Sequence, residues 1–453
     1  MSENRSSFTG KIGFVLAAAG SAVGLGNIWR FPYLAAKYGG GIFLLVYIAL
    51  SVTFGFSLMV AEIAIGRKTG KSAIQAFGSL DKRFSFVGWL AAIVPALILP
   101  YYSVIGGWVM KYLFGFVSGS ASDMATDSYF GNYIGGVWQP LLWLAIFLGL
   151  TALIVLFGVE KGVEKVSKVM MPVLVLLTAF IAIYTICSMD GAWGGVVYYI
   201  KPDFSKFSIM TVVAAMGQLF YSMSLAMGIM ITFGSYMKKD INIEKSAKQI
   251  EIFDTGVAFL AGLMIIPAVF AFSGGNEASL AQKGPGLMFE TLPKVFAQMP
   301  GGVFIGIAFF AMVFLAALTS SISLMETVVS AFIDKLRVSR KVGCLMVLGA
   351  SLLLGAASSL GYSAWSEFKI IGLQLLDFFD FATNSVMMPV IALFTCIFVA
   401  YILKPKTISD EIELSGKFKW KRLFEIVITY IAPICILAIL VSSVLDALGI
   451  LKI

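Results

Sequence analysis

The chain has 453 residues, of which 59% are hydrophobic and 13% charged, with a formal net charge of +8 and a mean hydropathy of +0.93. This composition excludes a soluble globular domain and indicates a protein that crosses the membrane many times. The lack of histidine excludes imidazole catalysis and histidine-ligated metals, and four scattered cysteines suggest neither a disulfide framework nor a zinc site.

Apolar runs of about 20 residues, the length that a bilayer core requires, recur along the whole chain. They predict eleven spans, at residues 12–36, 41–66, 86–115, 137–157, 163–187, 208–237, 250–273, 302–335, 341–361, 367–403 and 421–447. Residues 277–300, which contain two prolines and several polar residues, are predicted to form a large loop between the seventh and eighth spans. We therefore expect an all-α membrane protein, with residues 1–453 forming one transmembrane domain.

The basic residues are distributed unevenly between the two sides of these spans. Twenty-four Lys and Arg residues fall on the side of the N-terminus and seven on the other side. The positive-inside rule then predicts a cytoplasmic N-terminus and, after eleven crossings, an extracellular C-terminus in the cell membrane. Because membrane orientation explains the basic residues, no nucleic-acid partner is expected.

The first span is unusual because residues 19–33, AGSAVGLGNIWRFPY, contain glycines, an asparagine, an arginine and a proline. The sixth span has a similar interruption at residues 217–233, GQLFYSMSLAMGIMITF. Paired discontinuous helices at corresponding positions are typical of transporters with two inverted halves. The pattern predicts repeats at about 12–187 and 208–403, with 421–447 as an additional span.

A break at Gly24 and Gly26 frees backbone groups that lipid cannot satisfy. Carbonyl groups at the end of the first half-helix suit a cation, and amide groups at the start of the second half suit a carboxylate. The alternative is that these glycines only allow close helix packing. Asn27, Arg30 and Pro32 within the same two turns favour the binding site.

Several motifs together resemble the neurotransmitter:sodium symporter family, especially its bacterial transporters of hydrophobic amino acids, and the likeness extends over nearly the whole chain. The motifs are GSAVGLGNIWRFPY (20–33), AEIAIGR (61–67), PYYSVIGGW (100–108), GQLFYSMSLAMG (217–228), ALTSSISLMETVVSAFIDKL (317–336) and DFFDFATNS (377–385). The resemblance implies the leucine-transporter fold, with two inverted five-helix repeats in which helices 1 and 6 are discontinuous. It also implies sodium-coupled import of hydrophobic or neutral L-amino acids by alternating access, without catalysis.

The resemblance implies two sodium sites as well. The first would use Ala22, Asn27, Ser222 and Asp254, and the second Gly20, Val23, Ala316, Thr319 and Ser320. Apart from the family, the hydroxyl groups at 319–321 could simply bond back to their own helix. An acid at position 254 implies transport without chloride, and the two sites imply about two sodium ions per substrate.

The substrate pocket implied by the resemblance comprises Ala22, Gly24, Leu25, Gly26, Ile98, Tyr102, Tyr221, Ser222, Ser224, Met227, Ser321 and Leu324. Gly24 lacks the acidic side chain of monoamine transporters, so the substrate is expected to bring its own carboxylate. Arg30 with Asp380 resembles the family's extracellular gate and Arg5 with Asp334 its intracellular gate, while Glu62 is expected to support the unwound backbone.

Other function classes remain open from the residues themselves. A channel would need a continuous polar path, whereas the polar residues here cluster at the two breaks. A membrane enzyme would need an acid–base set, for which the chain offers poor candidates. A proton-driven permease on the same scaffold is the nearest alternative. The sequence does not indicate which amino acid is preferred, whether a second substrate site exists, or the oligomeric state.

Overall fold

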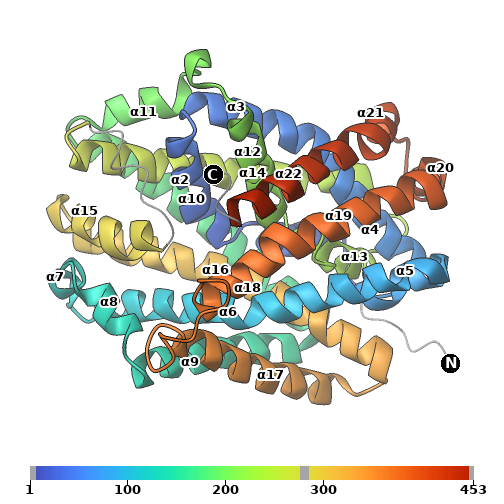
Figure 1. Cartoon of the computed structure of the whole chain (residues 1–453), viewed down its shortest axis with the longest axis horizontal. Coiled ribbons are helices and arrows are strands. Elements are labelled where there is room, and N and C mark those ends of the chain that lie inside the picture. Colours follow the sequence, from blue (N-terminus) through green and yellow to red (C-terminus); the bar gives the residue numbers. More distant parts are fainter. Residues whose placement is uncertain (1–6, 276–284, 448–453) are drawn as a thin grey trace.

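Long apolar helices make up most of the molecule in the computed structural model, which describes residues 7–275 and 285–447 (Figure 1). In lipid, helices satisfy every backbone group within the segment itself, which explains this architecture. Within the described residues, β-type pairing is limited to two isolated bridges, Gly40 with Pro202 and Ile370 with Leu373.

In the described part of the chain, nine continuous helices are long and apolar enough to cross a membrane. They are Gly41–Thr69, Lys82–Val117, Trp138–Leu156, Val159–Ser188, Ile243–Phe272, Gly302–Leu336, Arg340–Leu360, Leu375–Ile402 and Lys421–Ser442. A bent pair, Lys11–Ala22 with Gly26–Lys37, forms a tenth candidate. These helices correspond to ten of the eleven predicted spans, and the count of eleven stays a prediction.

Three of these nine spans carry two helix labels each in Figure 1 because a π-helical turn interrupts them. In chain order the spanning elements are α3 (Gly41–Leu50), α4 (Phe56–Thr69), α6 (Ser85–Val117), α9 (Trp138–Leu156), α10 (Lys165–Ser188), α14 (Ile243–Phe272), α16 (Gly302–Leu336), α17 (Arg340–Leu360), α18 (Leu375–Asp380), α19 (Met388–Ile397), α21 (Lys421–Ile426) and α22 (Ala432–Ala447). The connecting helices are α5 (Ala73–Leu80), α7 (Ala121–Met124), α8 (Tyr129–Ile134), α11 (Ala192–Ile200), α15 (Leu292–Gln298) and α20 (Pro405–Glu413).

The first predicted span is broken, as expected. Helix α1 (Lys11–Ala22) is followed by Val23, whose backbone is extended with φ −73° and ψ 102°. A π-helical turn, Gly26–Arg30, then leads into α2 (Phe31–Lys37), and the two halves are bent by 55°.

The sixth predicted span is also broken, into α12 (Ile209–Ser222) and α13 (Ile229–Gly234). Between them, Ser224, Ala226 and Gly228 have left-handed backbones with φ of 53°, 59° and 70°. Such a backbone is costly for residues with a side chain, so tertiary contacts must hold it. One such contact is the carboxylate of the buried Glu62, which accepts a hydrogen bond from the Ala226 amide at 2.8 Å. Glu62 therefore supports the unwound backbone, as predicted.

Several boundaries differ from the prediction; the seventh span, for example, begins at Ile243 rather than at residue 250. The described part of the predicted loop 277–300 contains a π-helical turn, Leu287–Thr291, followed by α15, because apolar side chains there, such as Phe289, are fully buried. The tenth span begins at Leu375 rather than at residue 367, since a turn closed by the Ile370–Leu373 bridge, with Gly372 at φ 81°, precedes it.

The two broken helices lie at the centre of the bundle. Helix α1 packs against α10, α14 and α16, and α13 packs against α4. Small residues such as Ala18, Ala19 and Gly20 are fully or almost fully buried, which lets the surrounding helices approach the α1 backbone closely. The fold thereby surrounds both breaks with protein rather than lipid.

Candidate functional site

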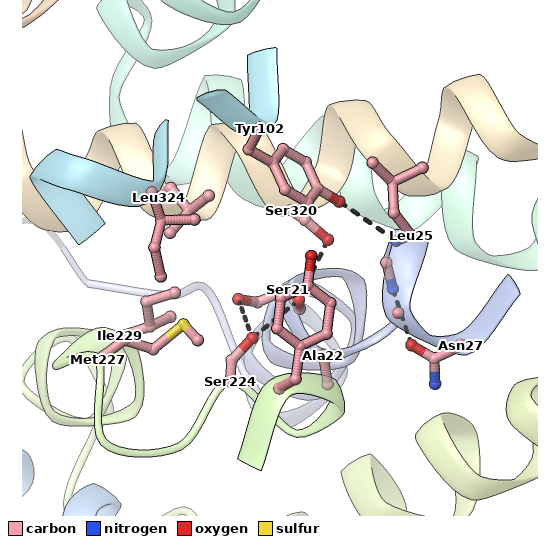
Figure 2. A pocket seen from close by; sticks show the side chains of 14 residues that line it. Ser21, Ala22, Leu25, Asn27, Tyr102, Ser224, Met227, Ile229, Ser320 and Leu324 are labelled. Carbon is pink, nitrogen blue, oxygen red and sulfur yellow. Dashed lines mark hydrogen bonds between the residues drawn. The ribbon is translucent and has the colours of Figure 1, made fainter. Parts of the chain in front are cut away.

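A pocket with about 360 Å³ of unfilled space, its mouth included, lies between the two breaks (Figure 2). The end of α1, the two unwound segments, α6 and α16 all contribute to its wall. The lining residues are Ser21, Ala22, Gly24, Leu25, Gly26, Asn27, Ile98, Tyr102, Tyr221, Ser224, Met227, Ile229, Ser320 and Leu324.

One end of this pocket is polar. The Leu25 amide donates a hydrogen bond to the Tyr102 hydroxyl at 3.3 Å, and the Gly24 amide donates to Oδ1 of Asn27 at 3.1 Å. A Cβ atom added at Gly24 would lie 2.7 Å from the Ser320 hydroxyl and 3.0 Å from the Tyr102 hydroxyl. Only glycine lets the backbone approach these hydroxyl groups so closely. Amide and hydroxyl donors at the start of a half-helix suit a carboxylate.

The other end is apolar. In Figure 2, Leu324, Ile229 and Met227 gather on the side of the pocket away from Leu25 and Asn27. The arrangement suits a small molecule with a polar head and an apolar body.

A buried carboxylate lies behind the polar end. Oδ1 of Asp254 accepts hydrogen bonds from Asn27 Nδ2 at 2.7 Å and from the Ser222 hydroxyl at 2.8 Å, and Oδ2 accepts one from the Tyr47 hydroxyl at 3.3 Å. Asp254 is 0% exposed, and among the described residues it has no ion-pair partner. Because all of these donors are neutral, the negative charge is left uncompensated in a dry environment. The residues therefore fit a cation, for which carboxylate, amide and hydroxyl oxygens are suitable ligands.

A second group of oxygen atoms lies where α16 meets the end of α1. The Ser320 hydroxyl is 3.4 Å from the Gly20 carbonyl oxygen, 3.2 Å from that of Ser21 and 3.3 Å from that of Val23. One hydroxyl proton cannot serve three carbonyl groups, so acceptor capacity remains for a cation. The Thr319 hydroxyl bonds back to the carbonyl groups of Leu315 and Ala316, at 2.9 and 3.1 Å.

Arg30 and Asp380 line one larger cavity of about 1230 Å³, which shares Tyr221 with the central pocket. Among the ion pairs of the described residues, none within 4 Å joins the two side chains. The Arg30 guanidinium lies 5.2 Å from the centre of the Tyr221 ring, and Asp380 accepts hydrogen bonds from Asn384 at 2.6 Å and Tyr101 at 3.2 Å. The predicted gate pair thus faces a common space without closing it.

The opposite side of the pocket is covered. Phe8 is 0% exposed and packs edge-to-face on Phe14 and Phe233 at 5.6 and 5.7 Å. Asp334 accepts a hydrogen bond from the Ser72 amide at 2.8 Å, and its predicted partner Arg5 lies outside the described residues.

The structure brings together all of the predicted substrate contacts except Ser222, which faces Asp254, and Ser321. The Ser321 hydroxyl instead shares a 2.8 Å hydrogen bond with Thr151 of α9. Ser21 and Ile229 also line the pocket and were not predicted. Their positions could have indicated this, since Ser21 lies just before the first break and Ile229 directly follows Gly228 at the end of the second.

Comparisons with known proteins agree with this geometry. The model of the sodium:neurotransmitter symporter family matches residues 5–127 and 131–450. The chain is 35% identical over 443 residues to the sodium-dependent transporter YhdH of Bacillus subtilis (strain 168), covering 96% of each protein. It is 28% identical to the sodium- and chloride-dependent taurine transporter of Canis lupus familiaris, over 90% of this chain and 73% of that protein.

A solved structure, the crystal structure of MhsT in complex with L-phenylalanine, superposes with a TM-score of 0.88 at 37% identity and covers 97% of this chain and 100% of that one. The fold is therefore that of the leucine transporter, as the sequence predicted. The family model matches nearly the whole chain and the relatives that match are sodium-dependent transporters. The protein belongs to the sodium:neurotransmitter symporter family.

Proposed function

We propose that this protein imports hydrophobic or neutral L-amino acids together with about two sodium ions per substrate, without a need for chloride. The observation that carries the proposal is Asp254, a fully buried carboxylate whose described donors are all neutral and which lies beside the central pocket. A cation bound there would neutralise this charge, and a substrate carboxylate bound beside it would be attracted by the same cation.

The substrate class follows from the two ends of the pocket. The amides of Leu25 and Gly26, with the Tyr102 hydroxyl, would hold the substrate carboxylate. Ile98, Met227 and Leu324 would contact an apolar side chain. The related MhsT structure contains L-phenylalanine, which supports an amino acid as the class of substrate.

In this proposal the first sodium ion is held by Asn27, Ser222, Asp254 and the Ala22 carbonyl group, and the substrate carboxylate completes its ligands. The second is held by Thr319, Ser320 and the carbonyl groups of Gly20, Val23 and Ala316. Sodium and substrate are then coupled because they share ligands. Since Asp254 brings a negative charge to the first site, chloride is not required.

We further propose that the Arg30 side faces the exterior and the Phe8 side the cytoplasm, so that the N-terminus lies inside and the C-terminus outside. Residues 12–187 and 208–403 would form the two inverted repeats, with 421–447 added after them. Closure of the cavity between Arg30 and Asp380, followed by opening at the Phe8 side, would move the substrate inward. In the state that the structure describes, aromatic side chains surround Phe8. Arg30 contacts Tyr221 and Asp380 contacts Asn384, rather than each other. In this proposal, that arrangement is the state closed on the inside.

The deciding experiment is uptake of a panel of radiolabelled amino acids into proteoliposomes. We expect uptake of apolar amino acids driven by an inward sodium gradient, lost when potassium replaces sodium and unchanged when gluconate replaces chloride. Uptake driven by a proton gradient in sodium-free buffer would instead favour the proton-coupled permease. A requirement for chloride would refute the role given to the Asp254 charge.

A further inference from the structure

An apolar groove lies on the lipid-facing surface where α5, α6 and α16 meet. Its unfilled space is about 560 Å³, and its lining residues are Ile74, Trp89, Ala92, Ile93, Ala96, Val328, Ala331, Phe332, Lys335 and Leu336. Nine of these ten side chains are uncharged and apolar or aromatic, and the tenth is the lysine. A groove of this composition, within the membrane-spanning part of the chain, is suited to a hydrocarbon chain.

The single cation of the groove lies at its rim. Nζ of Lys335 is 5.2 Å from the centre of the Trp89 ring, and Trp89 is 46% exposed. A tryptophan with an exposed lysine near the ends of spanning helices is typical of the headgroup level of a membrane, where lysine extends toward phosphate groups. The neighbouring Asp334 is directed to the Ser72 amide of the α5 segment at 2.8 Å, so the charge of Lys335 is available at the rim.

We propose that this groove binds one anionic phospholipid, with the phosphate at Lys335 and Trp89 and an acyl chain along Ile93, Ala96 and Val328. The occupant follows from charge and shape together, since the groove combines one cation at headgroup level with an apolar trough below it. Basic pockets between spanning helices bind anionic headgroups for this reason.

The same groove touches the elements that support the second break. A Cβ atom added at Gly228 would lie 2.7 Å from both the Ala73 Cβ and the Ala91 carbonyl oxygen, so α5 and α6 press directly on the unwound segment. The groove residues Ile74 and Ala92 are the immediate neighbours of Ala73 and Ala91 in the sequence. A lipid chain in the groove would therefore hold α5 and α6 against the unwound segment beside the pocket. Occupancy of the groove by lipid would then favour transport.

The binding test is native mass spectrometry of the delipidated full-length protein, titrated with dioleoylphosphatidylglycerol or dioleoylphosphatidylcholine. We expect the wild type to retain one phosphatidylglycerol molecule about fivefold more tightly than phosphatidylcholine, the preference that one lysine near the surface provides. Lys335→Gln should abolish this preference. Lys341→Gln is the matched control, because Lys341 is an exposed lysine on the first turn of α17, outside the groove, and should keep it.

A second variant, Ala96→Phe, fills the trough while leaving Lys335 in place and should reduce retention of both lipids. The proposal is overturned if the wild type shows no preference for phosphatidylglycerol, or if Lys335→Gln and Lys341→Gln lower it equally. Retention that Ala96→Phe leaves unchanged would overturn it as well. Binding is measured without sodium or amino acid, so its outcome is independent of the proposed transport function.

The coupling to the pocket has its own readout. Sodium-driven uptake should rise with the phosphatidylglycerol fraction of the liposomes in the wild type and in Lys341→Gln. In Lys335→Gln, the increase in uptake over the same range of lipid fractions should be at least threefold smaller. An equal response in all three proteins would show that lipid in the groove does not act on transport.

Discussion

At the scale of a single residue, Asp254 is the group on which the proposed first sodium site depends most. Its carboxylate is removed from water and contacted by Asn27, Ser222 and Tyr47, which are neutral donors. A protein without a ligand for this charge would gain stability from an apolar residue of similar size. The carboxylate is thus better explained by binding than by folding.

Replacing Asp254 by Asn tests this explanation, because the change keeps an oxygen ligand and removes only the charge. We expect the sodium concentration for half-maximal amino-acid uptake to rise at least tenfold, equivalent to about 1.4 kcal/mol. The control is Glu251→Gln, which neutralises another buried carboxylate one turn away that contacts Ser51 at 3.4 Å. A sodium dependence that is unchanged in Asp254→Asn, or shifted equally in both variants, would contradict the assignment.

The sequence predicted which polar residues lie together beside the breaks. It did not predict the direction in which each side chain points. Asn27, Ser222 and Asp254 come from three separate helices and meet as expected. Ser321 follows Ser320 directly, yet it faces α9, because successive helical residues are rotated by about 100°. Which of the two faces the break depends on how α16 is rotated in the bundle, and packing with distant helices sets that rotation.

At the scale of elements, the two breaks are the feature that the sequence indicated most directly, since glycines and polar residues interrupt apolar runs there. The backbone of the second break was less predictable, because Ser224 and Ala226 adopt left-handed conformations that side-chain-bearing residues disfavour. Tertiary contacts such as the bond from the Ala226 amide to Glu62 decide that conformation. The fold of α15 depends likewise on burial that no local pattern in residues 277–300 reveals.

The first break can be tested with Gly24→Ala. The added methyl group would lie 2.7 Å from the Ser320 hydroxyl and 3.0 Å from the Tyr102 hydroxyl, so it should push the backbone away from both cation and carboxylate contacts. Overpacking of this kind costs about 1–3 kcal/mol, and we expect the sodium-induced rise in the thermal unfolding temperature of the purified protein to be largely lost.

Gly256→Ala is the matched control for that experiment, because a Cβ atom added there, two residues beyond Asp254, meets nothing within 4 Å. This variant should keep the full sodium response. If Gly24→Ala kept it too, the close approach at the first break would have no role in binding sodium.

At the scale of the whole molecule, the cavity that Arg30 and Asp380 line shares Tyr221 with the central pocket, while Phe8 is buried among aromatic side chains at the start of α1. Arg30→Ala should lower uptake at least tenfold by preventing closure of that cavity. The sodium-induced rise in unfolding temperature should persist, since Arg30 lies outside both proposed sodium sites.

Lys37→Gln, which changes another cation lining the same cavity, serves as the control and should transport normally. Equal losses in both variants would indicate a general effect of positive charge rather than a gate.

Coupling of sodium to substrate can be measured without knowing the structure of any intermediate. Each sodium ion that moves down a tenfold gradient supplies about 1.4 kcal/mol, and a potential of 100 mV adds about 2.3 kcal/mol per charge. With the potential clamped at zero by potassium and valinomycin, a tenfold gradient should therefore drive about 100-fold accumulation of the preferred amino acid if two ions move with it, and only about tenfold accumulation if one does. The measurement is the steady-state ratio of radiolabelled substrate inside and outside tight proteoliposomes, with the sodium ionophore monensin as the control that abolishes accumulation.

We expect a ratio well above ten, because two oxygen clusters, around Asp254 and around Ser320, border the same pocket. A ratio that never exceeds ten in tight vesicles would mean that only one of these clusters binds a transported ion.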